Sequence, residues 1–526
     1  MSVDQLTSFQ EWADKNEAGN LPQVVLPSHY VTITECATQL FSLIAPTKQW
    51  FERGGVIMTV ARKDDGRLAL DILSPDAARS AFEKFASLYA WRSGENRAPV
   101  LKPTICSQDM AKALLKSQEA AATLPRVSGL LNCPVLYEVD GKLVMAQEGY
   151  DETTKLLITA GGEVPDIPLD DAVSQLSSLL DEFDFQSEGD KSRAVASIIT
   201  PALKTGGFLK KRVPVDVAEA DQSQSGKTYR QRIIAAIYNE KVSLVTSRTG
   251  GVGSVDESFN QALITGRPFI QLENIRGKFD SAHTEAFMTA DDSFPCRVPH
   301  QGEINILPDR FFIFLSSNGV DTTTDFANRS NIIRIRKKPA GFAYTRFEEG
   351  DLLDRVRHWQ SYFLGCVFAV IREWHRLGQQ RTEETRHDFR EWVAVVDWIV
   401  QHIFKLAPVM DGHRQAQERV SNPQLIWLRK LALQINETGE LSHALTATNL
   451  QRICETAGIS IPGLRPEADE NQANRVIGTI MAKLFGQNDA LDVDSFTVTR
   501  IVKRMARDNP LAGGATDTRT YTVAKK

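Results

Sequence analysis

The sequence predicts a multidomain α/β protein, and three observations lead to this fold class. The chain has 526 residues, which is enough for roughly three or four domains. Apolar residues form 42% of it and charged residues 24%, as in ordinary globular proteins that bury a core. Between residues 213 and 335, apolar strand-like runs alternate with helical patterns. This alternation is typical of a mostly parallel sheet covered by helices on both faces.

The most informative motif is a phosphate-binding loop with one irregular residue. It runs from Asp221 to Thr228, after an apolar run at 213–217 and before a helical pattern at 229–238. A nucleotide loop requires this strand–loop–helix context, although Gly-Lys-Thr also occurs at ordinary helix starts. We expect Lys227 to contact the β- and γ-phosphates, the Thr228 hydroxyl to bind Mg²⁺, and Asp221 to stand where glycine is usual. The expected nucleotide contacts are Asp221, Ser225, Gly226, Lys227 and Thr228.

The segments after the loop continue the alternation. Further strands are expected at 242–246, 268–274, 310–315 and 331–335, and helices at 256–264 and 281–290. In such sheets ligands bind outside the carboxyl ends of the strands. Polar residues at those ends are therefore the candidates for catalysis.

Glu273 and Asn274 close the strand expected at 268–274. We expect Glu273 to reach the Mg²⁺ shell, as an aspartate does in related ATPases, the alternative being a solvated turn. Asn274 stands where a catalytic glutamate is common, and its amide can orient water but cannot accept a proton at neutral pH. The identity of the general base is therefore left open.

Two further polar residues lie near strand ends. Asn318 follows the apolar run at 311–315 and is expected to contact the γ-phosphate or the attacking water, although Asn-Gly pairs also form plain turns. Arg329 precedes the last strand, where a guanidinium can serve as an arginine finger in a neighbouring subunit's site. The alternative for Arg329 is a solvated surface residue. The catalytic candidates are Lys227, Glu273, Asn274, Asn318 and Arg329.

Four segments in order carry a resemblance to a known family: Ser225–Thr228, Phe269–Gly277, Ser316–Asn318 and Asp325–Arg329. Together they resemble an AAA+ ATPase core. More narrowly, they are similar to the helicase domains of phage and mobile-element primase–helicases, which are related to superfamily III helicases. A weaker similarity at 134–151 extends the resemblance to about 40–400, with specific motifs only within 220–340. The departures from the common pattern are Asp221, Glu273 and Asn274.

The resemblance implies ATP and Mg²⁺ as ligands and a ring of subunits, with a hexamer expected. Strand-like runs at 294–298 and 303–306 flank a turn and predict a hairpin. In the helicases that the chain resembles, such a hairpin enters the central pore and grips single-stranded DNA. The residues expected to meet phosphates there are Arg297, His300 and Gln301. A plain surface hairpin is the alternative.

The flanking regions are expected to form accessory domains. A hairpin at 54–60 and 67–72 predicts a small α+β domain over residues 1–160, without the acidic triad or paired cysteines of a primase. The next divisions are a helical linker or collar at 161–205, the ATPase core at 206–340 and a helical lid at 341–422. Helices followed by a ribbon over 423–526 predict a winged helix that binds duplex DNA or docks a protein. Its basic candidates are Arg500, Lys503, Arg504 and Arg519.

Composition excludes several classes of protein. No stretch approaches eighteen apolar residues, so no membrane span is expected, and the first residues lack the features of a signal peptide. The six cysteines have no C-x-x-C spacing, which argues against a zinc site or a disulfide framework and favours a cytoplasmic location. The net charge of −5 argues against a uniformly basic coat but permits a basic lining inside a ring.

These observations lead to one expected function and two alternatives. The expected function is an ATP-dependent DNA helicase or translocase of a phage-like or mobile element, with a primase or another replication protein as candidate partner. The first alternative is an AAA+ switch or loader in replication initiation or phage defence that does not unwind DNA. The second is a nucleotide-binding scaffold with low turnover, which Asp221 and Asn274 would permit.

Overall fold

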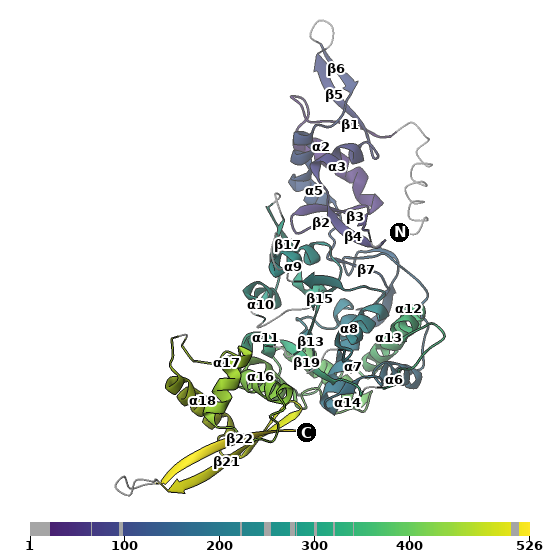
Figure 1. The fold of residues 1–526 in the computed structure, drawn as a ribbon. Helices are drawn as coiled ribbons and strands as arrows, with labels where there is room; N and C mark the ends of the chain where they lie inside the picture. The colour runs from purple at the N-terminus through teal and green to yellow at the C-terminus, as the bar shows by residue number, and fades with distance from the viewer. Residues whose placement is uncertain are drawn as a thin grey trace.

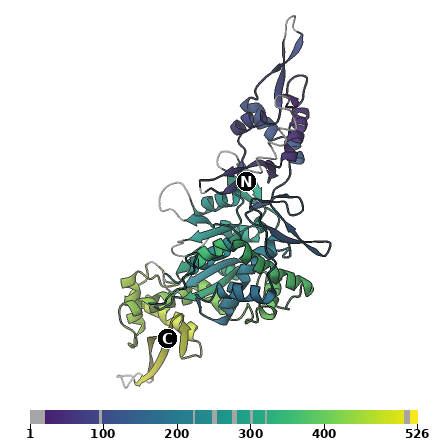
Figure 2. The same cartoon turned by 90° about the vertical axis from the view of Figure 1, so that its right-hand side faces the viewer.

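The computed structural model describes residues 21–526 except 65, 94–97, 221–223, 247–253, 274–278, 280, 299–301, 319–320, 340, 466 and 507–514. The molecule is elongated, with an N-terminal domain at one end, a central domain built on a large sheet, and a C-terminal domain at the other end (Figures 1 and 2). The predicted multidomain α/β class is confirmed.

The central domain contains a six-stranded sheet with the strand order β12-β19-β13-β18-β15-β14. All neighbouring pairs are parallel except β12 and β19, which are antiparallel. The strands are β12 (Asp184–Phe185), β13 (Val215–Ala220), β14 (Ser243–Thr246), β15 (Phe269–Glu273), β18 (Phe312–Asn318) and β19 (Ser330–Arg336). The predicted alternation of strands and helices is confirmed, and β13 is central, with β18 on one side and β19 on the other.

Two of these strands begin later along the chain than the sequence pattern indicates. The apolar run at 213–217 becomes a strand only at Val215, because Pro214 has no backbone N–H for the sheet. The strand expected from residue 310 begins at Phe312, because Pro308–Arg310 forms a 3-10 turn. Both strands continue further than expected, to Ala220 and Asn318, which brings polar residues to their carboxyl ends.

Helices cover both faces of this sheet and divide the core into two parts. On one face, α8 packs with α7 and with the predicted lid helices around Trp374 and Trp392, which are buried. On the other face, α9 and α10 pack with the hairpin β16–β17 around Phe259 and Phe294. These elements are α8 (Lys227–Ile237), α9 (Val255–Ile264), α10 (Ala282–Thr289), β16 (Phe294–Val298), β17 (Gly302–Ile306), α11 (Thr324–Asn328), α12 (Leu352–His358), α13 (Gln360–Arg376) and α14 (Arg390–His402).

The segment expected as a helical linker packs as part of the central domain. It contains α6 (Leu169–Ser178) and α7 (Glu188–Thr205). Nearly every residue of α7 is buried, and the helix packs against β19 and α14. Between the two helices, β12 adds the antiparallel edge strand to the sheet.

The N-terminal domain combines small sheets with short helices around its own core. The hairpin predicted near residues 54–72 is confirmed as β3 paired with β4, and β2 adds a third strand. A second sheet, β1-β5-β6, projects at the far end of the molecule (Figure 1). The elements are β1 (Gln23–Val25), α2 (Ile33–Ile44), β2 (Trp50–Arg53), β3 (Val56–Arg62), β4 (Leu68–Ile72), α3 (Pro75–Phe82), β5 (Ser87–Ser93), β6 (Pro99–Pro103), α4 (Gln108–Leu115) and α5 (Gln118–Thr123).

A pair of small sheets joins this domain to the central one. One has the order β10-β11-β7 and the other pairs β8 with β9. The strands are β7 (Gly129–Leu131), β8 (Val135–Val139), β9 (Lys142–Ala146), β10 (Gly149–Asp151) and β11 (Leu156–Ile158).

The C-terminal domain contains the helices α16, α17 and α18 and a three-stranded antiparallel sheet of order β20-β21-β22, while α15 precedes it and packs into the core of the central domain. Strands β21 and β22 are long, and their pairing runs from Phe496↔Lys525 to Ala506↔Ala515. They form a ribbon that projects from the domain (Figure 2), and residues 507–514 between the two strands lie outside the described part. The elements are α15 (His413–Ser421), α16 (Pro423–Glu437), α17 (Ala447–Ala457), α18 (Glu470–Phe485), β20 (Ala490–Val493), β21 (Phe496–Ala506) and β22 (Ala515–Lys525).

In the part of the chain that the structure describes, no helix combines the length and the apolar character needed to cross a bilayer.

A pair of buried histidines lies beside the start of β19. The rings of His387 and His413 stack with their centroids 5.4 Å apart, and both residues are 1% exposed. Burial lowers the pKa of His387 to about 4, and burial with His387 and Arg193 nearby lowers the pKa of His413 further below its usual value. Both imidazoles are therefore neutral in the folded protein near pH 7.

The histidine pair predicts acid sensitivity. In the unfolded chain His387 is protonated below about pH 6.5, whereas in the folded protein it is protonated only below about pH 4. The free energy of unfolding therefore falls as the pH falls through this window. The loss attributable to His387 is at most about 3 kcal/mol. Thermal unfolding from pH 7 to pH 4.5 should show a shallower fall in melting temperature for His387→Gln than for the wild type. Equal slopes would contradict this assignment.

Candidate nucleotide-binding site

The end of the predicted phosphate loop turns sharply into a helix. Gly226 is the N-cap of α8 and has φ +85°, a left-handed conformation that glycine adopts at little cost. A Cβ atom at this position would also lie 3.0 Å from the Phe183 ring. Gln224, two residues earlier, has φ +61°. Asp221 lies outside the described residues, so the structure gives no conformation for the irregular position.

Lys227 and Thr228 form the first turn of α8, where unpaired N–H groups favour an anion. Lys227 is 8% exposed, and its ammonium donates to the Ser225 hydroxyl at 3.1 Å. The Thr228 hydroxyl is 2.9 Å from the Ser316 hydroxyl on β18. Thr228, the predicted Mg²⁺ ligand, is therefore held against β18 at Ser316, two residues before Asn318.

The parallel register places the carboxyl ends of β13, β18 and β15 side by side, and these ends form the carboxyl edge of the sheet. Ala220 pairs with Asn318 and Ser316 pairs with Glu273, so β18 lies between the loop-bearing strand and the strand of Glu273. Glu273 is partly exposed, with Oε1 4.0 Å from Nη2 of Arg232. The structure thus brings together Lys227, Thr228, Glu273 and the backbone of Asn318. Asn274 and the side chain of Asn318 lie outside the described part.

A chain of buried polar groups continues beneath this edge. The Gln271 amide is 3.5 Å from the Ser316 hydroxyl and donates to Gln231 Oε1 at 3.0 Å. The Gln231 amide donates to Asp216 Oδ1 at 2.7 Å, and Arg230 forms an ion pair with the same carboxylate. The sequence pattern assigned no role to these residues. The glutamine within the apolar run Phe269–Leu272 could have indicated such a network, because a buried polar group requires a hydrogen-bond partner.

Arg329 lies at the opposite ends of the strands, beside the amino end of β13. Its carbonyl accepts a hydrogen bond of 3.1 Å from the N–H of Val215, the first residue of β13, and its side chain pairs with Asp325. The length of β13 separates Arg329 from the phosphate loop, which is roughly 17–20 Å at about 3.3 Å per residue. The side chain cannot span this distance.

The predicted hairpin is present as the antiparallel pair β16–β17. Arg297 is exposed and lies directly opposite Glu303, so the two charges oppose each other across the strands. His300 and Gln301 fall outside the described residues. The base of the hairpin contacts the N-terminal domain, where the N–H of Asn305 donates to the carbonyl of Gly54 at 3.1 Å.

The C-terminal basic residues have different surroundings. Arg500 is held close to its own domain, because its guanidinium is 3.1 Å from Asp489 Oδ1 and 3.0 Å from the carbonyl of Asn488. Lys503 and Arg519 are exposed on the projecting ribbon. The side chain of Arg504 lies outside the described residues. Lys503 and Arg519 are therefore more open to solvent than Arg500.

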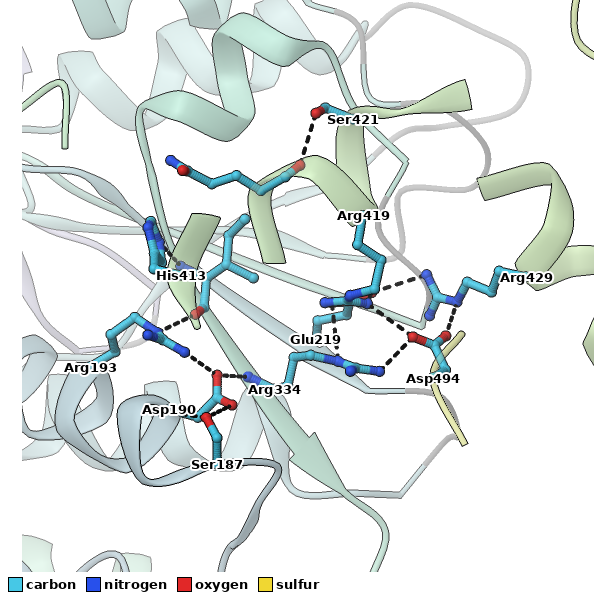
Figure 3. A network of polar contacts seen from close by, with 12 residues as sticks. Ser187, Asp190, Arg193, Glu219, Arg334, His413, Arg419, Ser421, Arg429 and Asp494 are labelled. Carbon is cyan, nitrogen blue, oxygen red and sulfur yellow. Dashed lines mark hydrogen bonds and ion pairs between the residues drawn. The ribbon is translucent and has the colours of Figure 1, made fainter. Parts of the chain in front are cut away.

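A buried network of charges lies on the other face of β13 (Figure 3). Glu219 is fully buried and bonds to Arg419 and Arg429, which come from α15 and α16. Burial alone would raise the pKa of Glu219, but Arg419, Arg429 and Arg334 outweigh it and hold the pKa below its usual range. Asp494 of the C-terminal domain bonds to the same arginines. No sequence signal identified this network, because its members come from five separate elements.

The side chains at the carboxyl edge fit a magnesium–nucleotide complex better than a metal held by protein alone. Among the described residues, no group of three or more His, Cys, Asp or Glu side chains is placed to hold a metal ion. Thr228 and Glu273 offer oxygen ligands, which Mg²⁺ prefers, and it usually takes one or two protein carboxylates together with substrate phosphates.

The comparisons with known proteins gave likenesses to solved structures, and those described below are weak. No protein-family model and no curated protein matches the sequence. Among solved structures, one described as "SCCmec type IV Cch - active helicase" has a TM-score of 0.30 at 10% identity, covering 90% of this chain and 91% of that chain. The A form apo structure of the NrS-1 C terminal region has a TM-score of 0.29 at 11% identity, covering 78% of this chain and 87% of that chain. Both likenesses are too weak to bear on function.

The contact between Thr228 and Ser316 predicts a defect in magnesium use. In Ser316→Ala the Thr228 hydroxyl loses this hydrogen-bond partner, worth about 1 kcal/mol, so the Mg²⁺ concentration for half-maximal ATP binding should rise about fivefold. The matched control is Ser317→Ala, since Ser317 pairs with Glu219 and faces the other side of the sheet. A magnesium titration with a fluorescent ATP analogue measures both. Equal behaviour of the two variants would contradict the role of Ser316.

Proposed function

We propose that this chain is an ATP-driven DNA helicase or translocase of a phage-like or mobile element that works as a ring, with a hexamer expected. One observation carries the proposal: Gly226-Lys227-Thr228 opens α8 at the carboxyl end of β13, beside the strand ends of Asn318 and Glu273. In this proposal residues 206–340 form an AAA+ core, residues 341–422 its lid and residues 423–526 a winged helix.

The residues at the carboxyl edge have separate roles in the proposed reaction. Lys227 binds the β- and γ-phosphates from the first turn of α8, where the helix N-terminus adds positive potential. Thr228 and Glu273 hold Mg²⁺, which neutralises charge that develops on the phosphates. Asn318 orients the γ-phosphate or the attacking water. Ser225 donors and the backbone of Gly226 complete the phosphate cradle.

Arg329 acts between subunits in this proposal. It lies at the far edge of the sheet from its own loop, next to the first residue of β13. A ring would place it near the phosphates of the adjacent subunit, where a guanidinium stabilises the transition state. Its present partner Asp325 is on the same short helix and is half exposed, so the pair can separate without burying a charge.

Contact with DNA is proposed at two surfaces. Single-stranded DNA would meet the tip of the β16–β17 hairpin, with Arg297, His300 and Gln301, through backbone contacts that do not depend on sequence. Duplex DNA would meet the β21–β22 ribbon, which presents Lys503 and Arg519 to solvent.

The two alternatives differ from the helicase in what stimulates turnover. A switch or loader would hydrolyse ATP in response to a protein partner and would not separate strands. A low-turnover scaffold would bind ATP and hydrolyse it hardly at all, which the asparagine at position 274 would permit. Stimulation of hydrolysis by DNA therefore favours the helicase over both.

The first test is strand displacement on forked DNA with ATP and Mg²⁺. The wild type should separate the strands, and Lys227→Ala should lose both displacement and ATP hydrolysis because the main cation on the phosphates is gone. Circular dichroism should show that the variant keeps its secondary structure. Wild-type hydrolysis by Lys227→Ala would remove the ATPase proposal, and hydrolysis without displacement in the wild type would favour the switch.

The second test asks whether active sites are shared between subunits. Arg329→Ala should bind ATP normally and hydrolyse it slowly, since the finger acts on a neighbour's nucleotide. Mixed with excess Lys227→Ala protein, it should regain measurable hydrolysis, because some interfaces then combine an intact loop with an intact finger. A size measurement must show that subunits exchange. Exchange without recovered hydrolysis would contradict the ring.

A further inference from the structure

Glu219 lies at the point where the nucleotide loop leaves the sheet. It precedes Ala220, the last residue of β13, and the segment predicted from the sequence as the phosphate loop begins at the next residue. Asp216 of the same strand faces α8, where Gln231 and Arg230 bond to it. Because side chains alternate along a strand, Glu219 faces away from α8, toward α15 and α16.

Three arginines hold the Glu219 carboxylate from different elements. Arg419 of α15 donates to Oε1 at 2.7 Å, and Nη1 of Arg429 on α16 is 3.0 Å from the same oxygen. Nε of Arg334, which pairs with Glu219 across the strands, is 3.8 Å from Oε2. Carboxylates held by several charge-assisted hydrogen bonds have little freedom to move, so the end of β13 is fixed in place.

Asp494 of the C-terminal domain brings a second carboxylate to the same arginines. It lies between β20 and β21 with φ +55°, and it is 7% exposed. Its Oδ1 is 2.6 Å from Nη2 of Arg334 and 3.4 Å from Nη1 of Arg419, and its Oδ2 forms an ion pair with Arg429. Figure 3 shows the two carboxylates sharing these guanidinium groups. The C-terminal domain and β13 therefore each bond to the same arginine side chains through one carboxylate.

A second contact links α15 to the strand of Asn318. The N–H of Thr322, four residues after Asn318, donates to the carbonyl of Val420 at 3.0 Å. Lys430 of α16 is 3.3 Å from Asp321 Oδ2 in the same segment. The helices that carry Arg419 and Arg429 thus contact the chain next to both strand ends that border the loop.

We infer that Asp494 is a positioning residue for the nucleotide loop: through Arg419 and Arg429 it fixes Glu219, so nucleotide affinity depends on how the C-terminal domain is docked. This inference rests on the proposed binding of ATP. Because coupling between two sites is reciprocal, nucleotide binding would in turn tighten the docking of the C-terminal domain. The domain that carries the exposed ribbon would then respond to the nucleotide state of the central domain.

The test replaces Asp494 with asparagine and measures the affinity for a fluorescent, slowly hydrolysed ATP analogue with Mg²⁺. Asparagine tolerates positive φ as aspartate does, so Asp494→Asn removes the charge and keeps the backbone. The dissociation constant should rise at least about fivefold, the lower end of usual coupling between sites. Asp494→Glu keeps the charge, so its affinity for the analogue should lie between that of the wild type and that of Asp494→Asn.

The matched control is Asp492→Asn, which removes an exposed carboxylate on β20, two residues before Asp494. Asp492 bonds to Thr497 and Lys526 within the C-terminal domain and does not belong to the network. Its affinity for the analogue should equal that of the wild type. If both variants weaken nucleotide binding equally, the effect comes from the stability of the domain, and the inference is wrong.

Hydrogen exchange gives a second readout that does not depend on a measured affinity. Saturating the wild type with the analogue and Mg²⁺ should slow exchange in α15, α16 and β20, and Asp494→Asn should lose this response. Unchanged exchange in these elements, or wild-type affinity in Asp494→Asn, would overturn the inference while leaving the ATPase proposal standing. If the wild type fails to bind the analogue at all, the proposed function fails first and the inference falls with it.

Discussion

Two buried carboxylates on β13 constrain the arrangement of the central and C-terminal domains. Asp216 is bonded on one face of the strand by Arg230 and Gln231 of α8. Glu219 is bonded on the other face by Arg419 and Arg429. Removing one partner of a buried ion pair costs about 3–5 kcal/mol, so neither side can shift without loss of stability. The strand that leads into the predicted phosphate loop is thereby fixed from both faces.

The N-terminal domain and the β16–β17 hairpin are joined in a similar way. Arg53 is buried at the end of α9 and donates to the carbonyls of Leu263 and Ile264, and burial lowers its pKa to about 10. A Cβ atom on Gly54 would lie 1.9 Å from the carbonyl oxygen of Asn305, so only glycine permits this close approach. The domain and the hairpin share one apolar core. In the proposed motor, the hairpin would therefore move together with the N-terminal domain.

The alternation of strands and helices was predictable because it depends on local periodicity. The runs at 242–246, 268–274 and 331–335 appear as β14, β15 and β19, and the hairpins at 54–72 and 294–306 are also present. The strand limits were less predictable. Pro214 delays β13, and the long pairing of β21 with β22 depends on a partner strand that the pattern of either strand alone does not reveal. The third strand of the C-terminal sheet, β20, was missed because four residues are too few to show a periodic pattern.

The sequence by itself determined the α/β class, the strand–loop–helix setting of Lys227 and Thr228, and the polar residues at the strand ends, because each depends on residues close together in the chain. Only the tertiary structure decided that β18 separates β13 from β15, that Arg329 lies at the edge opposite the loop, and that Asp494 shares arginines with Glu219. These facts depend on strand order and on contacts between residues far apart in the sequence. Periodicity shows which face of an element is buried, but the partner it is buried against is chosen by packing in three dimensions.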